Sequence, residues 1–161
     1  MKLMKVLSIL LVCLFFFGCN NYDEFKEVPY KGQLEGKFIE ISYSRINGFS
    51  GKGSSLTFQD DGKVISQVYE NIYSHDTINK ESQISREKLE NLAFQIQENK
   101  YFELEDSYDC RTQNPKDCLT DQDETEFKVT IGDKTKTVKE YDDHGPKVLR
   151  HIQNLLTEYA S

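Results

Sequence analysis

The order of apolar and polar residues divides the chain into an apolar leader, a polar stretch and a longer region with regular periods. In that longer region residues 39–43 alternate between apolar and polar, which is the period of a strand with one buried face. Residues 56–58 and 64–73 are predicted to be the second and third strands, and residues 77–84 the fourth. The first half of this region is therefore expected to form a sheet.

Glycine-containing turns separate the predicted strands. Residues 60–62 (Asp-Asp-Gly) are a hairpin signal, because glycine accepts the positive φ that such a turn needs. Residues 47–55 are rich in Gly and Ser and are predicted to be a loop. Residues 132–133 (Gly-Asp) signal a second hairpin, which joins an alternating strand at 127–131 to its partner at 134–141.

Two segments have the apolar spacing of helices. Ser85 is a good N-cap for a helix whose apolar residues recur at i, i+3, i+4 and i+7 from Leu89 on. Pro146 opens a terminal helix, since proline suits the first turn. The buried face of that second helix is predicted to contain Val148, Leu149, Ile152, Leu155, Leu156 and Tyr159.

The order strands, helix, hairpin, helix predicts an α+β domain, with an antiparallel β-sheet and two α-helices packed on one face. A chain of 161 residues is expected to hold one such domain. We assign it to residues 37–161. Residues 19–36 are polar and are expected to be a tether.

The apolar leader has the organisation of an export signal. Two lysines precede an apolar run from Val6 to Phe17, and a small residue, Gly18, follows it. The run has roughly 12 residues, whereas a membrane-spanning helix needs about 20. We therefore expect residues 1–18 to be a signal peptide that is removed on export.

Residues 16–19 (Phe-Phe-Gly-Cys) resemble the bacterial lipobox, in which the cysteine receives a diacylglycerol before cleavage on its N-terminal side. The usual box has Leu and a small residue where this chain has two phenylalanines. The resemblance implies lipidation of Cys19, cleavage between Gly18 and Cys19, and anchoring by acyl chains to a membrane of the bacterial cell envelope, facing the periplasm or the cell surface. Cys13 suits lipidation less, because apolar residues continue past it. The alternative is an ordinary secretory signal that is cut near Gly18.

Charge and cysteine content narrow the choice of partners and of compartment. The formal net charge of −7 argues against nucleic acid as a partner, because binding there depends on basic residues. With Cys19 acylated, Cys110 and Cys118 remain as an even pair, and an oxidising envelope favours a disulfide between them. The alternative, a redox pair, lacks the C-x-x-C spacing.

The sequence contains no motif that argues for catalysis. Asp121 and Asp123 begin like a calcium loop and are the candidates for a bound cation, but the turn glycine and the distal glutamate are missing. His75, His144 and His151 do not stand at zinc-ligand spacing, although His151 is expected to be partly buried and His144 to be a turn residue. We therefore expect no metal and no cofactor.

Short motifs follow one another along the predicted domain: Asp61-Gly62-Lys63-Val64, Tyr101-Phe102, Asp106-Ser107-Tyr108, Thr120-Asp121 and Lys134-Thr135-Lys136-Thr137-Val138. In order and spacing they resemble one uncharacterised bacterial family, the domain of unknown function numbered 6438. The resemblance extends roughly from Phe38 to Tyr159. Members of that family are mostly lipoproteins and envelope proteins, so the resemblance implies a fold and a location. It implies no accepted activity and no catalytic residues.

Three functional hypotheses remain open. The first is a membrane-anchored, non-catalytic binding domain that meets another envelope protein. The second is an inhibitor or immunity-type protein against an envelope toxin, because an acidic surface suits a basic partner. The third is an enzyme with an acid-lined site that no sequence motif reveals.

Overall fold

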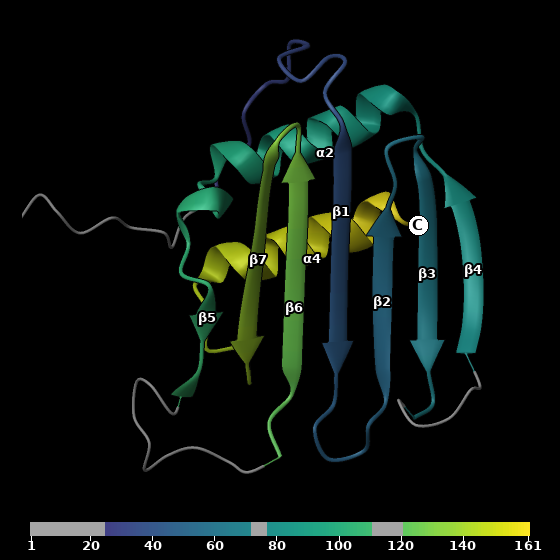
Figure 1. Cartoon of the computed structure of the whole chain (residues 1–161), viewed down its shortest axis with the longest axis vertical. Helices are drawn as coiled ribbons and strands as arrows, with labels where there is room; N and C mark the ends of the chain where they lie inside the picture. Colours follow the sequence, from purple (N-terminus) through teal and green to yellow (C-terminus); the bar gives the residue numbers. More distant parts are fainter. Residues whose placement is uncertain (1–24, 72–76, 111–120) are drawn as a thin grey trace, which may run out of the picture.

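The computed structural model describes residues 25–71, 77–110 and 121–161. These residues form a mixed 7-stranded sheet with two long helices, so the α+β class is confirmed (Figure 1). The strand order is β4-β3-β2-β1-β6-β7-β5. The elements are β1 Ile39–Ile46, β2 Gly53–Phe58, β3 Lys63–Tyr69, β4 Thr77–Gln83, α2 Arg86–Glu98, the 3₁₀ turn η1 Tyr101–Glu103, β5 Ser107–Tyr108, β6 Glu124–Ile131, β7 Lys134–Tyr141 and α4 Lys147–Tyr159.

The sequence predicted a wholly antiparallel sheet, and this is wrong for one strand pair. The short strand β5 runs parallel to β7, with Ser107 opposite Lys139 and Tyr108 opposite Glu140. All other strand pairs in the described chain are antiparallel. A strand of two residues has no period to detect, so the alternation of the sequence could not reveal it.

The hairpins follow the turn chemistry, with two changes of strand boundary, one of which is that β3 ends at Tyr69 and not at residue 73 as predicted. Gly62 (φ 84°) lies between β2 and β3, and Gly132 (φ 62°) lies between β6 and β7, both as predicted. However, β2 already begins at Gly53, inside the segment predicted to be a loop, and Gly53 pairs with Ile46 of β1. The Gly- and Ser-rich composition concealed the start of this strand, because neither residue type favours strands.

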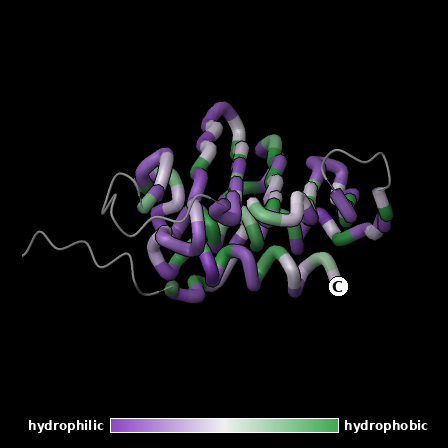
Figure 2. The backbone as a smooth tube through the Cα atoms, turned by 90° about the horizontal axis from the view of Figure 1, so that it is seen from below, coloured by the Kyte–Doolittle hydropathy of each residue, from purple (hydrophilic) through white to green (hydrophobic). Residues whose placement is uncertain are grey.

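Each long helix begins as its sequence indicates. The side chain of Ser85 accepts a hydrogen bond from the backbone N–H of Lys88, and Pro146 directly precedes α4. In Figure 1 both helices lie behind the strands. In Figure 2 the tube of α4, which ends at the label C, alternates between hydrophobic (green) and hydrophilic (purple) stretches. α2 and α4 have 13 residues each. Among the described residues, no helix has the length and apolar character that crossing a membrane requires.

The core lies between the helices and the strands. Ile39, Ile41 and Tyr43 of β1 are buried and alternate with half-buried polar residues, which confirms the predicted period. The predicted stripes of the two helices are also buried, except that Leu155 and Tyr159 of α4 are half-buried. The buried helix residues named in the sequence prediction are Leu89, Leu92, Ala93 and Ile96 of α2 and Val148, Leu149, Ile152 and Leu156 of α4.

Residues 25–36, expected to be part of a polar tether, instead lie against the folded domain. Leu34 is 1% exposed and belongs to the core, and Val28 and Tyr30 pack against it. This part of the expected tether is therefore part of the domain. Its apolar residues are too sparse among charged neighbours to give a period, and residues 19–24 lie outside the described part of the chain.

Candidate functional site

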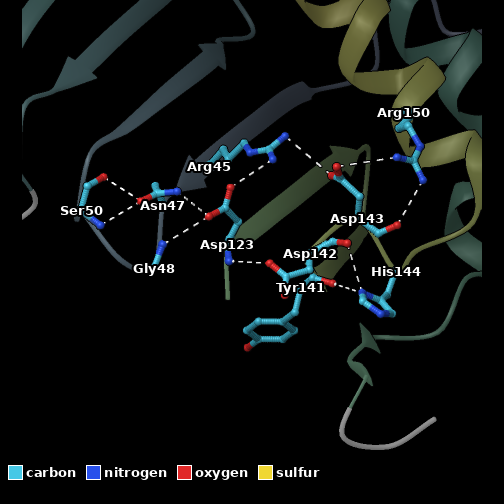
Figure 3. A network of polar contacts seen from close by, with 10 residues as sticks. All are labelled: Arg45, Asn47, Gly48, Ser50, Asp123, Tyr141, Asp142, Asp143, His144 and Arg150. Carbon is cyan, nitrogen blue, oxygen red and sulfur yellow. Dashed lines mark hydrogen bonds and ion pairs between the residues drawn. The ribbon is translucent and has the colours of Figure 1, made fainter. Parts of the chain in front are cut away.

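Charged side chains gather where β1 ends, β6 begins and β7 leads into α4 (Figure 3). We name Arg45, Asp123, Asp142, Asp143 and Arg150 the aspartate–arginine cluster. Nη2 of Arg45 lies 3.1 Å from Oδ2 of Asp123, and its Nη1 lies 3.6 Å from Oδ1 of Asp143. Nη1 of Arg150 approaches the other oxygen of Asp143 at 3.6 Å. The cluster thus joins three elements that are distant in sequence.

Asp123 holds the loop between β1 and β2 against the start of β6. Its Oδ1 accepts a hydrogen bond of 2.7 Å from Nδ2 of Asn47, and the Asn47 carbonyl oxygen Oδ1 accepts one of 2.8 Å from the backbone N–H of Ser50. Gly48 allows this close approach, since a Cβ atom there would lie 2.2 Å from the carbonyl oxygen of Gln122. The loop is therefore fixed by its neighbours.

Asp142 and Asp143 both adopt left-handed backbone conformations, with φ of 50° and 56°. Aspartate tolerates this region better than most residues, yet two in succession are strained. The strain is maintained by contacts, since Oδ1 of Asp142 accepts a 2.9 Å hydrogen bond from the backbone N–H of Asp123. Residues held in such sparsely populated backbone conformations cluster at functional sites.

Glu140 lies buried beneath this turn, with 2% of its surface exposed. Its Oε2 accepts a hydrogen bond of 3.2 Å from the backbone N–H of Gly145, whereas its Oε1 is buried and has no hydrogen-bond partner among the described residues. Burial raises the pKa of Glu140, and the nearby charge of Asp143 raises it further. The carboxyl group is therefore biased toward its neutral, protonated form.

The candidate cation ligands are not brought together. Asp123 already receives hydrogen bonds from Arg45 and Asn47, and Asp121 is exposed. Within the ranges that the structure describes, no group of three His, Cys, Asp or Glu residues could hold a metal ion. Arg45 and Arg150 instead neutralise the carboxylates that a cation would need.

The other residues singled out in the sequence have different outcomes. His144 lies in the turn after Asp143, as predicted, and its Nδ1 is 2.8 Å from the carbonyl oxygen of Tyr141. His151 was expected to be partly buried, which is wrong, because it lies on the exposed side of α4 with its ring centroid 5.6 Å from that of Phe25. His75 lies outside the described residues.

The cysteines can be followed only in part. Cys110 is buried, with 3% of its surface exposed, and its Sγ accepts a hydrogen bond from Nε2 of Gln122. Gly18, Cys19 and Cys118 lie outside the described residues, so the cleavage site, the lipidation and the disulfide remain predictions.

Sequence reasoning did not single out Arg45, Glu140 or Arg150. A signal for Glu140 was present, because it follows Val138 by two positions and so lies on the same face of β7. Strand alternation predicts that this position is buried, and a carboxyl group that is buried must either be paired with a partner or be neutral. The two arginines gave no such signal, since their partners are brought close only by the fold.

Comparison with known proteins gives a family but no activity. No curated protein matches the chain. A family described as a domain of unknown function, DUF6438, matches residues 51–160. The matched residues include β2 to β7 and all of α4, whereas β1 and residues 25–36 precede them. The chain therefore belongs to the DUF6438 family.

Proposed function

We propose that this chain is a lipoprotein of the bacterial cell envelope, whose domain is a non-catalytic binding module. One observation carries the proposal: two lysines, a short apolar run and Gly18-Cys19 follow one another in the order of a lipoprotein signal. Acyl chains on Cys19 would hold the protein stably, because two or more chains anchor a protein where one does not.

The start of the described chain supports an orientation. Phe25 packs against His151 on α4, so the chain enters the domain on its helical side. Only five residues lie between Cys19 and Phe25, so the two can be at most about 20 Å apart. We infer that α2 and α4 share the face of the sheet nearer the membrane, and that the opposite face points away from it.

That opposite face is mostly polar and suits a binding role. Ser42 and Thr57 are polar neighbours across β1 and β2 on this side, and the apolar Ile65 of β3 lies next to Thr57. Next to them, Ser55 and Tyr69 each lie within hydrogen-bond distance of Oε1 of Gln67. Hydroxyl and amide groups in a row can exchange hydrogen bonds with a partner.

The anchor is tested by matched cysteine substitutions in the native host. C19S should abolish lipidation and, because the diacylglycerol is added before cleavage, should leave an uncleaved precursor that keeps residues 1–18. C13S is the control, and it should be processed and anchored like the wild type. Loss of lipidation in C13S, or a lipidated and cleaved product from C19S, would overturn the assignment of Cys19.

The binding face is tested by a photo-cross-linking residue placed in living cells. Thr57 lies on the face away from the helices, and Thr157 on the exposed side of α4 is the matched control. We expect one specific envelope protein to be cross-linked from Thr57 and not from Thr157. A specific product from position 157 alone would contradict the proposed face, and a basic toxin captured at Thr57 would favour the immunity-type alternative.

We also propose that Cys110 and Cys118 form a disulfide. Burial of Cys110 and export to an oxidising compartment support this pairing. Alkylation of the unfolded protein without a reductant should modify neither thiol. Modification of both would contradict the disulfide.

A further inference from the structure

Two side-chain amides, that of Gln95 in α2 and that of its C-cap residue Asn99, bind the main chain of residues 25–31, which we name the strap. Oε1 of Gln95 accepts a hydrogen bond of 2.9 Å from the backbone N–H of Val28, and its Nε2 donates to the carbonyl oxygen of the same residue. Asn99 binds Lys26 in the same way. Its Oδ1 accepts a hydrogen bond of 2.6 Å from the backbone N–H of Lys26, and its Nδ2 donates one of 2.8 Å to the Lys26 carbonyl oxygen. Each amide thus satisfies both polar groups of one peptide residue.

The spacing of the helix matches that of the strap. Gln95 lies near the end of α2 and the C-cap residue Asn99 follows four positions later, so their side chains are neighbours about 5–6 Å apart. Lys26 and Val28 are two residues apart in an extended chain, about 6.6 Å, and their backbone groups point the same way. The match explains why these two buried polar side chains, at 5% and 8% exposure, are tolerated on the helix.

No residue of the strap is fully buried. Lys26, Glu27 and Pro29 are exposed, and Phe25 and Val28 are only half-buried. A hollow of about 600 Å³ lies between the strap and α2, lined by residues that include Glu27, Val28, Glu87 and Gln95. Water can therefore reach the interface along one side.

Besides the contact of Phe25 with His151, Tyr30 makes two contacts with α2. The hydroxyl of Tyr30 donates a 2.7 Å hydrogen bond to Oε2 of Glu90, and its ring centroid lies 5.5 Å from that of Phe94. Beyond it Gly32 has φ of 81°, and Leu34 is 1% exposed in the core. Leu34 is thus the first fully buried residue of the described chain, and Gly32 can serve as a hinge between it and the strap.

We propose that residues 25–31 are a releasable strap, hinged at Gly32, that sets how far the domain stands from its anchor. With the strap bound, the chain between Cys19 and Phe25 spans at most about 20 Å. With the strap released, the chain between Cys19 and Gly32 spans at most about 45 Å. The change in height rests on the proposed anchor at Cys19, whereas the release of the strap does not.

Hydrogen exchange of the full-length protein in vesicles tests the release. The backbone N–H groups of Lys26 and Val28 should exchange through a local opening, roughly 100-fold faster than that of Ile96 in the core of α2. The double variant Q95A/N99A should accelerate exchange at Lys26 and Val28 by about tenfold or more, because it removes the hydrogen-bond partners of both groups. Exchange at Ile96 should stay within about twofold of the wild type.

Two other variants keep the test interpretable. Q97A, the same substitution on α2 away from the strap, should leave exchange at Lys26 and Val28 unchanged. Y30F removes only the hydroxyl that binds Glu90, and it should accelerate strap exchange by a few-fold, about what one lost hydrogen bond gives. This milder variant decides the question if the double variant does not fold.

A protease provides the second readout. Cleavage after Lys31 frees the domain from vesicles, and Q95A/N99A should increase the rate of this release over that of Q97A. The proposal is overturned if Lys26 and Val28 exchange as slowly as Ile96, or if the variants accelerate all three sites equally. Absence of the protein from vesicles would refute the anchor instead, and exchange measured in solution would still judge the strap.

Discussion

The backbone N–H of Gly145 donates a hydrogen bond of 3.2 Å to Oε2 of Glu140, a side chain that is 2% exposed and whose other oxygen has no partner among the described residues. Gly145 is required here, because a Cβ atom at this position would lie 2.3 Å from that oxygen. The backbone at Gly145, just ahead of α4, and a buried acid of β7 are thus fitted to each other.

The buried acid gives the protein a defined response to pH. Burial raises the pKa of Glu140 above its value in the unfolded chain. Its stabilising contribution is therefore complete below the unfolded pKa and is lost as the pH rises through the folded pKa. E140Q should remove this dependence and raise the free energy of unfolding at alkaline pH by about 1–3 kcal/mol, the cost of burying an unsatisfied polar group.

Urea unfolding of wild type and E140Q from pH 4 to pH 9 checks this prediction. E158Q, at an exposed position of α4, is the control and should keep the wild-type profile. Parallel stability curves for wild type and E140Q would show that Glu140 does not titrate as its burial implies.

The loop that carries Gly48 should not tolerate a side chain. In G48A the new Cβ would meet the backbone oxygen of Gln122 at 2.2 Å, so one of the two loops must shift. We expect a loss of about 1–3 kcal/mol in thermal or urea unfolding, as for other overpacked sites. F49A is the control, because the neighbouring Phe49 is 85% exposed, and its stability should not change measurably.

Tyr101 should contribute through its hydroxyl as well as its ring. The side chain is 0% exposed, and its hydroxyl donates a 2.7 Å hydrogen bond to the carbonyl oxygen of Phe127 in β6. Y101F should lower the free energy of unfolding by about 1–3 kcal/mol, because it leaves a buried carbonyl group without this donor. In Y159F, at a half-buried position, the loss should be smaller. Equal losses in urea unfolding of the two variants would contradict this role.

Lys100 should be better replaced by glycine. It follows the end of α2 with φ of 62°, a conformation that suits glycine at this position of a helix end. K100G should be neutral or stabilise the protein by up to about 1 kcal/mol. K88G, the same change inside α2, should instead destabilise by about 1 kcal/mol. Thermal unfolding that gave both variants the same sign would refute this account of Lys100.

The period of the sequence was enough to predict most of the fold. Alternation located β1, β6 and β7, and turn chemistry located the hairpins at Gly62 and Gly132, because both signals are local. The parallel strand β5 and the start of β2 at Gly53 escaped, since two residues have no period and glycine is a poor strand former.

The contacts of the strap and of the aspartate–arginine cluster could not be predicted. Gln95 and Asn99 look like ordinary polar helix residues until Val28 and Lys26 are brought to them by the fold, 67 and 73 positions away. Asp123 was considered as a cation ligand, and only the approach of Arg45 across 78 positions reveals its role. Local patterns do not encode such long-range partners.

The central claim is that Cys19 carries lipid, and the mass of the N-terminal peptide from the native membrane fraction tests it most directly. We predict a peptide that begins at Cys19 and carries the added mass of a thioether-linked diacylglycerol. A peptide that begins at another residue, or an unmodified Cys19 thiol in the mature protein, would contradict the account.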